Sequence, residues 1–323
     1  MSADYYRSKL RGTQAKEFYD SIVTQIENGN LSGRFELSGD KWRGMKEDAI
    51  NAISAVRLDR PDFFFFGREY RAEQIGTRVT LSVDVLYNKD QIGRIRRILE
   101  LLLDKLISDT DDLNELEREK LIYKRVALMR KYENNGTPED HSVVGPVLNG
   151  TGVCEGYSAL LALALRRARI RCICVSGKGG NEDHAWNVVW CYGVPCHVDV
   201  TWESVLEGEV GYFYFNQSDA EISLDHTVNP RIHPACHTVF EELKGVKSFD
   251  SGKEGMNHII GELASGKDSA RVEIQKTHDL ELWIKRALFF SPSGSYRYTI
   301  DPIHKRALAV KVKKTGKGKR KEK

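Results

Sequence analysis

The sequence lacks a hydrophobic run long enough to cross a membrane. A spanning helix needs roughly 18 or more apolar residues in succession, and the most apolar stretch here, residues 61–66 (PDFFFF), is far shorter. The first 18 residues, MSADYYRSKLRGTQAKEF, contain no apolar segment of the kind that signal peptides carry. We therefore expect a cytoplasmic protein with no membrane span.

Disulfide, metal and nucleotide motifs are also missing. The six cysteines show no disulfide-framework spacing, so free thiols in a reducing compartment are expected. Cys191, Cys196 and His197 lack a second ligand pair with structural-zinc spacing. The glycine-rich residues 177–180 (GKGG) do not follow the pattern of a phosphate-binding loop. We expect no metal and no cofactor.

Charge of either sign is nearly balanced, except at the C-terminus. The net charge is +3, but residues 311–323 (KVKKTGKGKRKEK) contain eight Lys or Arg and one Glu, which leaves −4 for the rest of the chain. Blocks of like charge are commonly disordered, and that is our prediction for this tail. It could touch nucleic acid or anionic lipid, but because no DNA- or RNA-binding motif accompanies it, we expect no nucleic-acid partner.

The first part of the chain, residues 1–110, is predicted to be a helical region with a β-hairpin. A length of 323 residues indicates two or three compact units. Apolar residues recur at helical spacing in several segments, and the alternating residues 69–87 around Gly76-Thr77 indicate a hairpin. The predicted helices cover residues 16–28, 41–57, 89–107 and 112–132, with a turn-rich break at residues 29–40.

Residues 111–240 are predicted to form a second, α+β region. A helix begins at Cys154 and leads into a strand at 171–177. Two strands follow, one opening at His184 and one containing Asp199, separated by the turn at 192–194. A further strand is predicted at 211–215. A helix followed by antiparallel strands is typical of α+β folds and not of alternating βαβ units.

Residues 241–310 are predicted to be a small C-terminal α+β unit. The pattern indicates helices at 253–265 and 279–289, a strand at 271–275 and a hairpin at 295–312. We find no internal repeat at any fixed period.

Three residues in the middle region could perform chemistry together. The stretch 152–157 (GVCEGY) places Cys154 at the start of an apolar helix, where the backbone best stabilises a thiolate. A free thiol is mostly protonated at pH 7 and needs such help. Neighbouring antiparallel strands lie about 4.8 Å apart, so His184 could meet Asp199 across the turn, and a carboxylate there would orient the imidazole. The Cys154 amide is a natural oxyanion donor.

Each of these residues also has a purely structural explanation. A lone cysteine is usually a buried apolar residue, and His184, between tryptophan-rich segments, could be a core histidine. Asp199 interrupts an apolar strand and needs a partner there. Asp183 is the rival orienting acid, but its neighbours are ordinary loop residues, which favours Asp199.

Three aromatic residues surround the predicted site. Trp186, Trp202 or Tyr157 could shield an acyl intermediate or bind an acyl donor, and the alternative is that they belong to the core. Period-2 spacing puts Trp186 on the same strand face as His184.

Three blocks in this order resemble the signature of the transglutaminase-like superfamily, and specifically its prokaryotic branch. They read GVCEGY, DHAWN and HVDVTW, and His141-Ser142 and the segment FNQSDAEISLDH resemble its usual flanks, so that the likeness covers roughly residues 110–228. The resemblance implies a papain-like α+β core with Cys154 as nucleophile, His184 as base and Asp199 as orienting acid. In that family a thioester is resolved by water or by an amine.

Three functions stay open on the sequence alone. We favour a cysteine hydrolase that acts on peptide or amide bonds of a protein or peptide substrate. The alternatives are a transglutaminase that joins glutamine to an amine and a non-catalytic interaction module. The family's calcium-dependent cross-linkers are much larger, and no EF-hand-like acidic loop is present. The helix 120–135 (KLIYKRVALMRKYENN) lacks the family's usual His-Asp pair, so substrate handling is expected to differ. The sequence predicts neither the oligomeric state nor the substrate.

Overall fold

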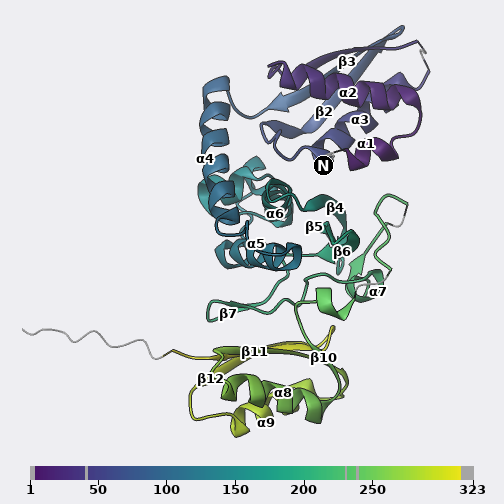
Figure 1. Ribbon diagram of the computed structural model, residues 1–323. Coiled ribbons are helices and arrows are strands. Elements are labelled where there is room, and N and C mark those ends of the chain that lie inside the picture. The colour runs from purple at the N-terminus through teal and green to yellow at the C-terminus, as the bar shows by residue number, and fades with distance from the viewer. Residues whose placement is uncertain (1–3, 41–42, 230, 238–239, 314–323) are drawn as a thin grey trace, which may run out of the picture. The chain divides into compact units, whose positions relative to one another are not determined.

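The structure, a computed structural model, describes residues 4–40, 43–229, 231–237 and 240–313 (Figure 1). The chain divides into two compact units. Unit 1 comprises Met1–Thr201 and Asn216–Val239, and unit 2 comprises Trp202–Phe215 and Phe240–Lys323. Within the described residues, no helix is both long enough and apolar enough to span a membrane. The predicted basic tail lies, from residue 314 on, outside the described residues.

The N-terminal part of unit 1 is a three-stranded antiparallel sheet with helices on one face. The strand order is β1-β3-β2, and alternate residues such as Phe35, Leu37, Val79 and Leu81 are buried, so a single face packs against the helices. The elements are α1 (Tyr5–Lys9), α2 (Thr13–Glu27), β1 (Arg34–Ser38), α3 (Met45–Asp59), β2 (Phe66–Ile75) and β3 (Arg78–Val85).

The rest of unit 1 packs a central helix on a four-stranded antiparallel sheet. The sheet has the order β6-β5-β4-β9, and α6, which is buried along most of its length, lies against β4 and β5 with α4 and α5 beside it (Figure 1). The elements are α4 (Lys89–Ile107), α5 (Glu115–Met129), η1 (Pro138–His141), η2 (Gly145–Asn149), α6 (Cys154–Arg167), β4 (Arg171–Gly179), β5 (Glu182–Cys191), β6 (Val194–Val198), α7 (Asp219–Ile222) and β9 (His226–Thr227).

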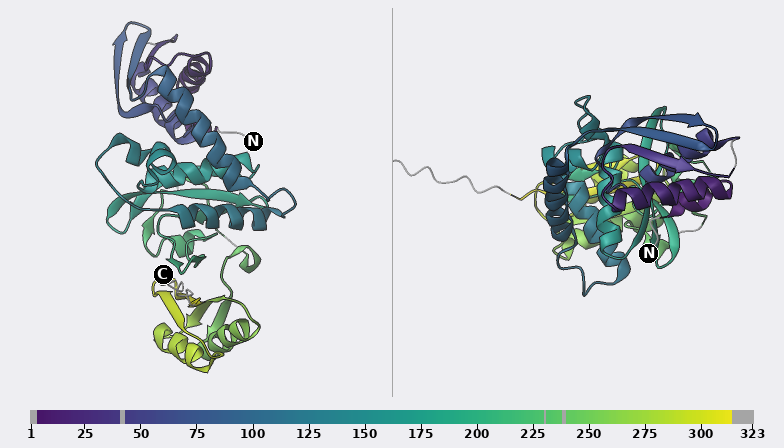
Figure 2. Two further views of the ribbon diagram at one scale, coloured as in Figure 1. Left: turned by 90° about the vertical axis from the view of Figure 1, so that its left-hand side faces the viewer. Right: turned by 90° about the horizontal axis from the view of Figure 1, so that it is seen from above.

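Unit 2 is a second, smaller α+β structure. Its sheet has the order β10-β11-β13-β12, with β10 parallel to β11, and two helices cover one face (Figures 1 and 2). The elements are β7 (Val205–Leu206), β8 (Glu209–Val210), η3 (Glu241–Leu243), β10 (Ser248–Ser251), α8 (Gly252–Ala264), β11 (Ser269–Lys276), α9 (Leu280–Phe290), β12 (Tyr296–Asp301) and β13 (Arg306–Lys311).

The predicted α+β fold class is confirmed: helices pack on antiparallel sheets, and α6 begins at Cys154 as predicted. The predicted helices at 16–28, 89–107, 112–132, 253–265 and 279–289 and both hairpins also correspond to observed elements within a few residues. Of the helix predicted at 41–57, residues 41–42 lie outside the described part, and α3 starts at Met45. The domain boundary predicted at residue 110 stays a prediction.

The predicted strand at 211–215 is wrong. Tyr212 adopts a positive φ of 58°, which breaks an extended strand. The backbone N–H groups of Phe213 and Tyr214 donate to the buried Glu203 carboxylate at 3.1 and 3.3 Å, in place of a neighbouring strand. Five of the described strands were not predicted. β1 lies inside the turn-rich segment 29–40, and β7, β8, β9 and β10 have two to four residues each, which is too short to show a period.

Candidate functional site

The start of α6 is shaped by the glycines of the GVCEGY stretch. Val153 precedes the helix in an extended conformation with no side-chain cap, so the first backbone N–H groups of the helix are not used by a capping side chain. Gly156 lets residues 140–142 approach the helix closely, because a Cβ at this position would lie 2.8 Å from the carbonyl oxygen of Ser142. The same geometry directs Cys154 into the site.

Cys154 is largely buried and contacts two polar side chains. It is 8% exposed, and its thiol lies close enough to the imidazole of His184 for the two groups to interact. The Tyr132 hydroxyl also lies beside Cys154, and burial together with this cysteine raises the pKa of Tyr132 to about 12. Tyr132 is held there by a parallel bridge to Gly152, two residues before the cysteine.

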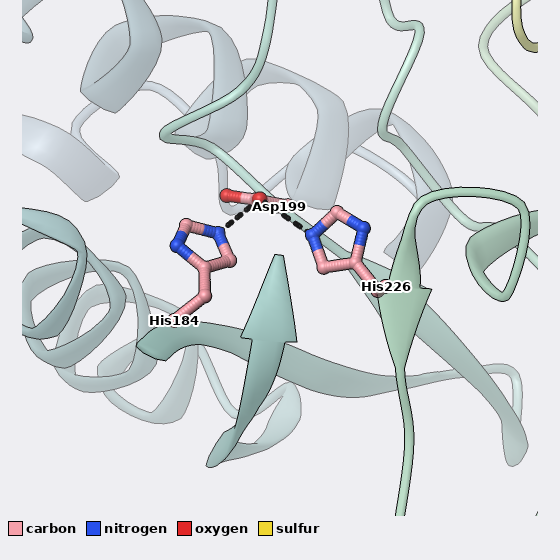
Figure 3. Close-up of side chains that lie close together, drawn as sticks. All are labelled: His184, Asp199 and His226. Atoms are coloured by element: carbon pink, nitrogen blue, oxygen red, sulfur yellow. Dashed lines mark hydrogen bonds and ion pairs between the residues drawn. The ribbon is translucent and has the colours of Figure 1, made fainter. Parts of the chain in front are cut away.

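His184 and Asp199 meet as the strand pattern predicted. A two-residue turn, Tyr192-Gly193, joins β5 to β6 with positive φ at both positions, as is usual in tight hairpins. His184 Nε2 lies 2.7 Å from Asp199 Oδ2, and both residues are buried. The second ring nitrogen of His184 points away from Asp199 (Figure 3).

The other carboxylate oxygen of Asp199 is held by Thr201. The backbone N–H and the hydroxyl of Thr201 both donate to Asp199 Oδ1, at 2.7 and 2.6 Å. These two donors hold the carboxylate on the side away from His184 and so orient its plane toward the imidazole.

A second imidazole binds the same carboxylate oxygen. His226 Nε2 lies 3.2 Å from Asp199 Oδ2, and His226 Nδ1 lies 2.5 Å from Asp225 Oδ1 (Figure 3). His226 arrives on the two-residue strand β9, which pairs with Lys178 and Gly179 of β4. A Cβ at Gly177 would lie 2.3 Å from the Thr227 carbonyl oxygen, so glycine is required there for β9 to approach.

The charges of these groups support one another. Burial lowers the pKa of His184, but its hydrogen bonds to Asp199 and Cys154 and their charges outweigh burial and raise that pKa to about 10. Burial alone would raise the pKa of Asp199. The hydrogen bonds and charges of the two imidazoles outweigh burial and hold that pKa well below its usual range. The pKa of His226 is raised, against burial, by Asp199 and Asp225. The site thus favours a protonated His184 beside an ionised Asp199.

Trp186 and His197 support the site from the sheet. The indole N–H of Trp186 donates to His197 Nδ1 at 3.0 Å, and its ring stacks on His184 at 6.0 Å between centroids. Because an indole only donates, His197 Nδ1 must be an acceptor, and its Nε2–H donates to Asp219 at 3.0 Å. We conclude that Trp186 is a fully buried structural residue of this site.

Two groups of potential metal ligands occur among the described residues: His184, Asp199 and His226, and His197, Asp219 and Cys236. In the first group, the imidazole nitrogens lie at hydrogen-bonding distance from the carboxylate, and in the second, Nε2 of His197 carries its proton toward Asp219. Both arrangements are those of charge-assisted hydrogen bonds.

Three other residues named from the sequence lie in different surroundings. The Tyr157 hydroxyl accepts from the Lys131 N–H at 2.7 Å and donates to the Lys131 carbonyl at 3.0 Å. Trp202 is part of unit 2, where its ring meets Tyr214 edge to face at 5.8 Å. The side chain of Asp183 is 93% exposed and pairs with Lys178 at 2.7 Å, whereas Asp199 contacts His184.

The five remaining cysteines are buried and free. Burial is the main cause that raises the pKa of each of these thiols, and the pKa of Cys174 and Cys236 reaches about 11 and about 12. Thiols of this kind are inert. The others in this group are Cys172, Cys191 and Cys196.

Sequence reasoning missed Tyr132, Thr201 and His226. His226 lies inside the flanking segment that resembles the family, but no period or spacing linked it to Asp199. The glycine at 177, opposite His184 in the β4–β5 pairing, was the available signal for a close backbone approach.

Residues 104–203 match the sequence model described as the Transglutaminase-like superfamily. The chain thus contains a transglutaminase-like region at these residues. No curated protein matches the chain.

Several solved structures resemble it distantly. A TGase has 13% identity and a TM-score of 0.32 over 52% of this chain and 50% of its own. A proposed cysteine protease from Cytophaga hutchinsonii has 12% identity and a TM-score of 0.28, over 42% and 62%. The periplasmic domain of TgpA from Pseudomonas aeruginosa has 17% identity and a TM-score of 0.24, over 40% and 56%. The chain thus spans about half to three fifths of the length of these proteins.

Proposed function

We propose that the protein is a cysteine acyl-transfer enzyme that cleaves peptide or amide bonds through a thioester on Cys154. The observation that carries this proposal is the unbroken chain of contacts from the thiol through His184 to Asp199. A nucleophile hydrogen-bonded to a base, with the base oriented by a third group, is the arrangement that covalent catalysis requires.

The first half of the reaction forms the thioester. Cys154 Sγ, as the thiolate, attacks the carbonyl carbon of the substrate, and the carbonyl oxygen becomes an oxyanion. The Cys154 N–H, at the start of α6, donates to this oxyanion. Protonated His184 gives its proton to the leaving nitrogen, the C–N bond breaks, and the amine departs.

The second half releases the enzyme. Neutral His184 takes a proton from an incoming water, whose oxygen attacks the thioester carbon. The C–S bond breaks, the thiolate is regenerated and the proton stays on His184. An amine in place of water gives transamidation by the same steps. We favour hydrolysis, because water reaches a thioester without a second binding site, whereas an amine acceptor needs one.

Limited alkylation tests the nucleophile. With substoichiometric iodoacetamide at pH 7, Cys154 should be labelled well ahead of the five buried thiols, as measured by peptide mapping. His184→Gln should slow this labelling by at least about tenfold, since the imidazolium stabilises the thiolate. Uniform labelling of all six cysteines, or labelling unaffected by His184→Gln, would favour a non-catalytic module.

Two assays separate hydrolysis from transamidation. The protein is incubated with a casein digest, and new peptide termini are measured by mass spectrometry. In parallel, dimethylcasein and a fluorescent amine report on amine incorporation. We expect new termini that are absent with Cys154→Ala. Incorporation of the amine above the Cys154→Ala background would overturn the preference for hydrolysis and leave the acyl-transfer proposal intact.

A further inference from the structure

A cavity of about 400 Å³ lies within unit 1, between the N-terminal sheet region and the start of α6. This volume is in the range of small-ligand sites. One wall is apolar and aromatic, built by residues of α3 and of the segment before and at the start of β2, including Leu58, Phe63, Phe64 and Phe66. The opposite wall belongs to α6 and β4.

The cavity is close along the chain to the proposed nucleophile and base. Glu155 and Ala185 line it, and each directly follows one of these two residues, Cys154 and His184. Successive side chains of a strand point to opposite faces of the sheet, so Ala185 and the cavity lie on the face of β5 that is opposite to His184.

The cavity carries an excess of positive charge. Three arginines line it. Arg60 is neutralised by Asp62 and Glu27, both at 2.8 Å. Arg57 is half-buried and donates to the Arg68 carbonyl oxygen at 2.8 Å. Among the described residues it forms no ion pair.

The carboxylate nearest to Arg57 is already engaged by other groups. Glu155 pairs with Arg68 at 3.3 Å and with the imidazole of His141. Desolvation lowers the pKa of Arg57, and the charge of Glu155 offsets this only in part. A half-buried guanidinium without a carboxylate partner is costly, and an anionic ligand would remove that cost.

We propose that this cavity is an accessory subsite that binds an acidic side chain on an apolar peptide, with the carboxylate on Arg57 and the apolar neighbour on the phenylalanine wall. The proposal goes beyond the proposed function, since it adds a peptide-binding site that is separate from the reacting atoms. It uses charge complementarity and the fork geometry by which arginine holds carboxylates.

Binding to Cys154→Ala protein tests the subsite without turnover. The two probes are acetyl-Phe-Glu-amide and acetyl-Phe-Gln-amide, which differ in one charged group, and the dissociation constants are measured by NMR titration. We expect the Glu peptide to bind about tenfold more tightly, as a charge-assisted hydrogen bond implies. Arg57→Gln should abolish this preference, and Arg57→Lys should retain part of it.

Arg34→Gln is the matched control, since Arg34 lies on β1 with a side chain that is 68% exposed. It should leave the preference unchanged. Equal affinities for the two peptides, or a preference that survives Arg57→Gln, would overturn the subsite. If the preference is found but Cys154 is not labelled selectively, the proposed function fails and the anion-binding site stands.

Discussion

Each of the two units contains a short contact between a buried aspartate and a buried histidine, with nearly the same distance. In unit 1, His184 and Asp199 are 2.7 Å apart. In unit 2, His304 Nδ1 lies 2.6 Å from Asp301 Oδ2. By distance and burial alone, the two pairs cannot be told apart.

Their surroundings differ. Asp301 is three residues from its partner, and its other oxygen accepts the backbone N–H groups of Ile303 and His304 at 3.0 and 3.2 Å, so the pair closes the β12–β13 turn. Asp199 is 15 residues from His184, and beyond that histidine lies a thiol. The comparison teaches that the same Asp–His distance can belong to a closed turn or to a pair that lies beside a thiol, so the pair alone does not identify a reactive site.

Parallel substitutions in the two pairs should have the largest and most divergent effects. Asp199→Asn is expected to lower Cys154-dependent turnover by about 10³–10⁴-fold, because the amide no longer stabilises protonated His184. Asp301→Asn should leave turnover within about twofold. The measurement is the rate of new peptide termini in the casein digest. Equal losses in both variants would mean that each aspartate acts only through folding.

The second test concerns a buried ion pair confined to unit 2. Arg306 donates to Glu273 Oε2 at 2.7 Å and also to the Phe213 carbonyl oxygen, and both charged side chains are nearly inaccessible. Glu273→Gln leaves Arg306 buried without this carboxylate, which should cost about 3–5 kcal/mol. Urea unfolding should show this loss while alkylation of Cys154 is unchanged. A simultaneous loss of selective labelling would contradict the separation of the two units.

The third test is the pH dependence of the unit 1 pair. The pKa of His184 is raised to about 10 in the folded protein, so its stabilising effect is complete below the unfolded value near 6.5 and is lost as the pH rises through about 10. From pH 7 to 10, the free energy of unfolding should fall by on the order of 2 kcal/mol more in wild type than in His184→Gln.

His258 of unit 2 is the matched control for that experiment. Burial lowers the pKa of His258, so its contribution changes on the acid side of the unfolded value. His258→Gln should therefore follow the wild-type slope between pH 7 and 10. Identical slopes in wild type and His184→Gln would show that the His184–Asp199 pair does not retain its proton.

The smallest effect is expected at Glu119 of unit 1. Removing the charge of this residue should stabilise the protein, whereas removing the charge of Glu273 should destabilise it. Burial raises the pKa of Glu119 to about 7, and Cys191 and Asn216 are its hydrogen-bond partners. The folded protein then loses stability as the pH rises from about 4.5 to about 7. Glu119→Gln should stabilise the protein by about 1–2 kcal/mol at pH 8 and not at pH 4. Destabilisation at pH 8, measured by urea unfolding, would contradict this.

Local signals in the sequence predicted most of the core. The helix start at Cys154 follows from a glycine turn before an apolar run, and the meeting of His184 with Asp199 follows from a two-residue hairpin that fixes the register. These features depend on residues close together in the chain, which is why one sequence was sufficient.

Features that depend on distant segments could not be predicted. His226 reaches Asp199 on a two-residue strand, which is too short to show any alternation. Tyr132 is brought beside Cys154 by a single bridge to Gly152. In the segment 211–215, the aromatic alternation indicated a strand, but the carboxylate of Glu203 takes the backbone N–H groups. Long-range hydrogen bonding outweighed local propensity in each case.

The division of the chain has a consequence for how the protein is made. Residues 202–215 belong to unit 2, yet residues 216–239, which include His226, return to unit 1. On the ribosome, unit 1 is therefore complete before Arg271 and Arg306, which bind the carbonyl oxygens of Val210 and Phe213, have emerged. The nascent chain carries 202–215 as a loop whose partners arrive last. A truncation after residue 239 would contain every residue of the proposed site but would leave residues 202–215 without the rest of unit 2.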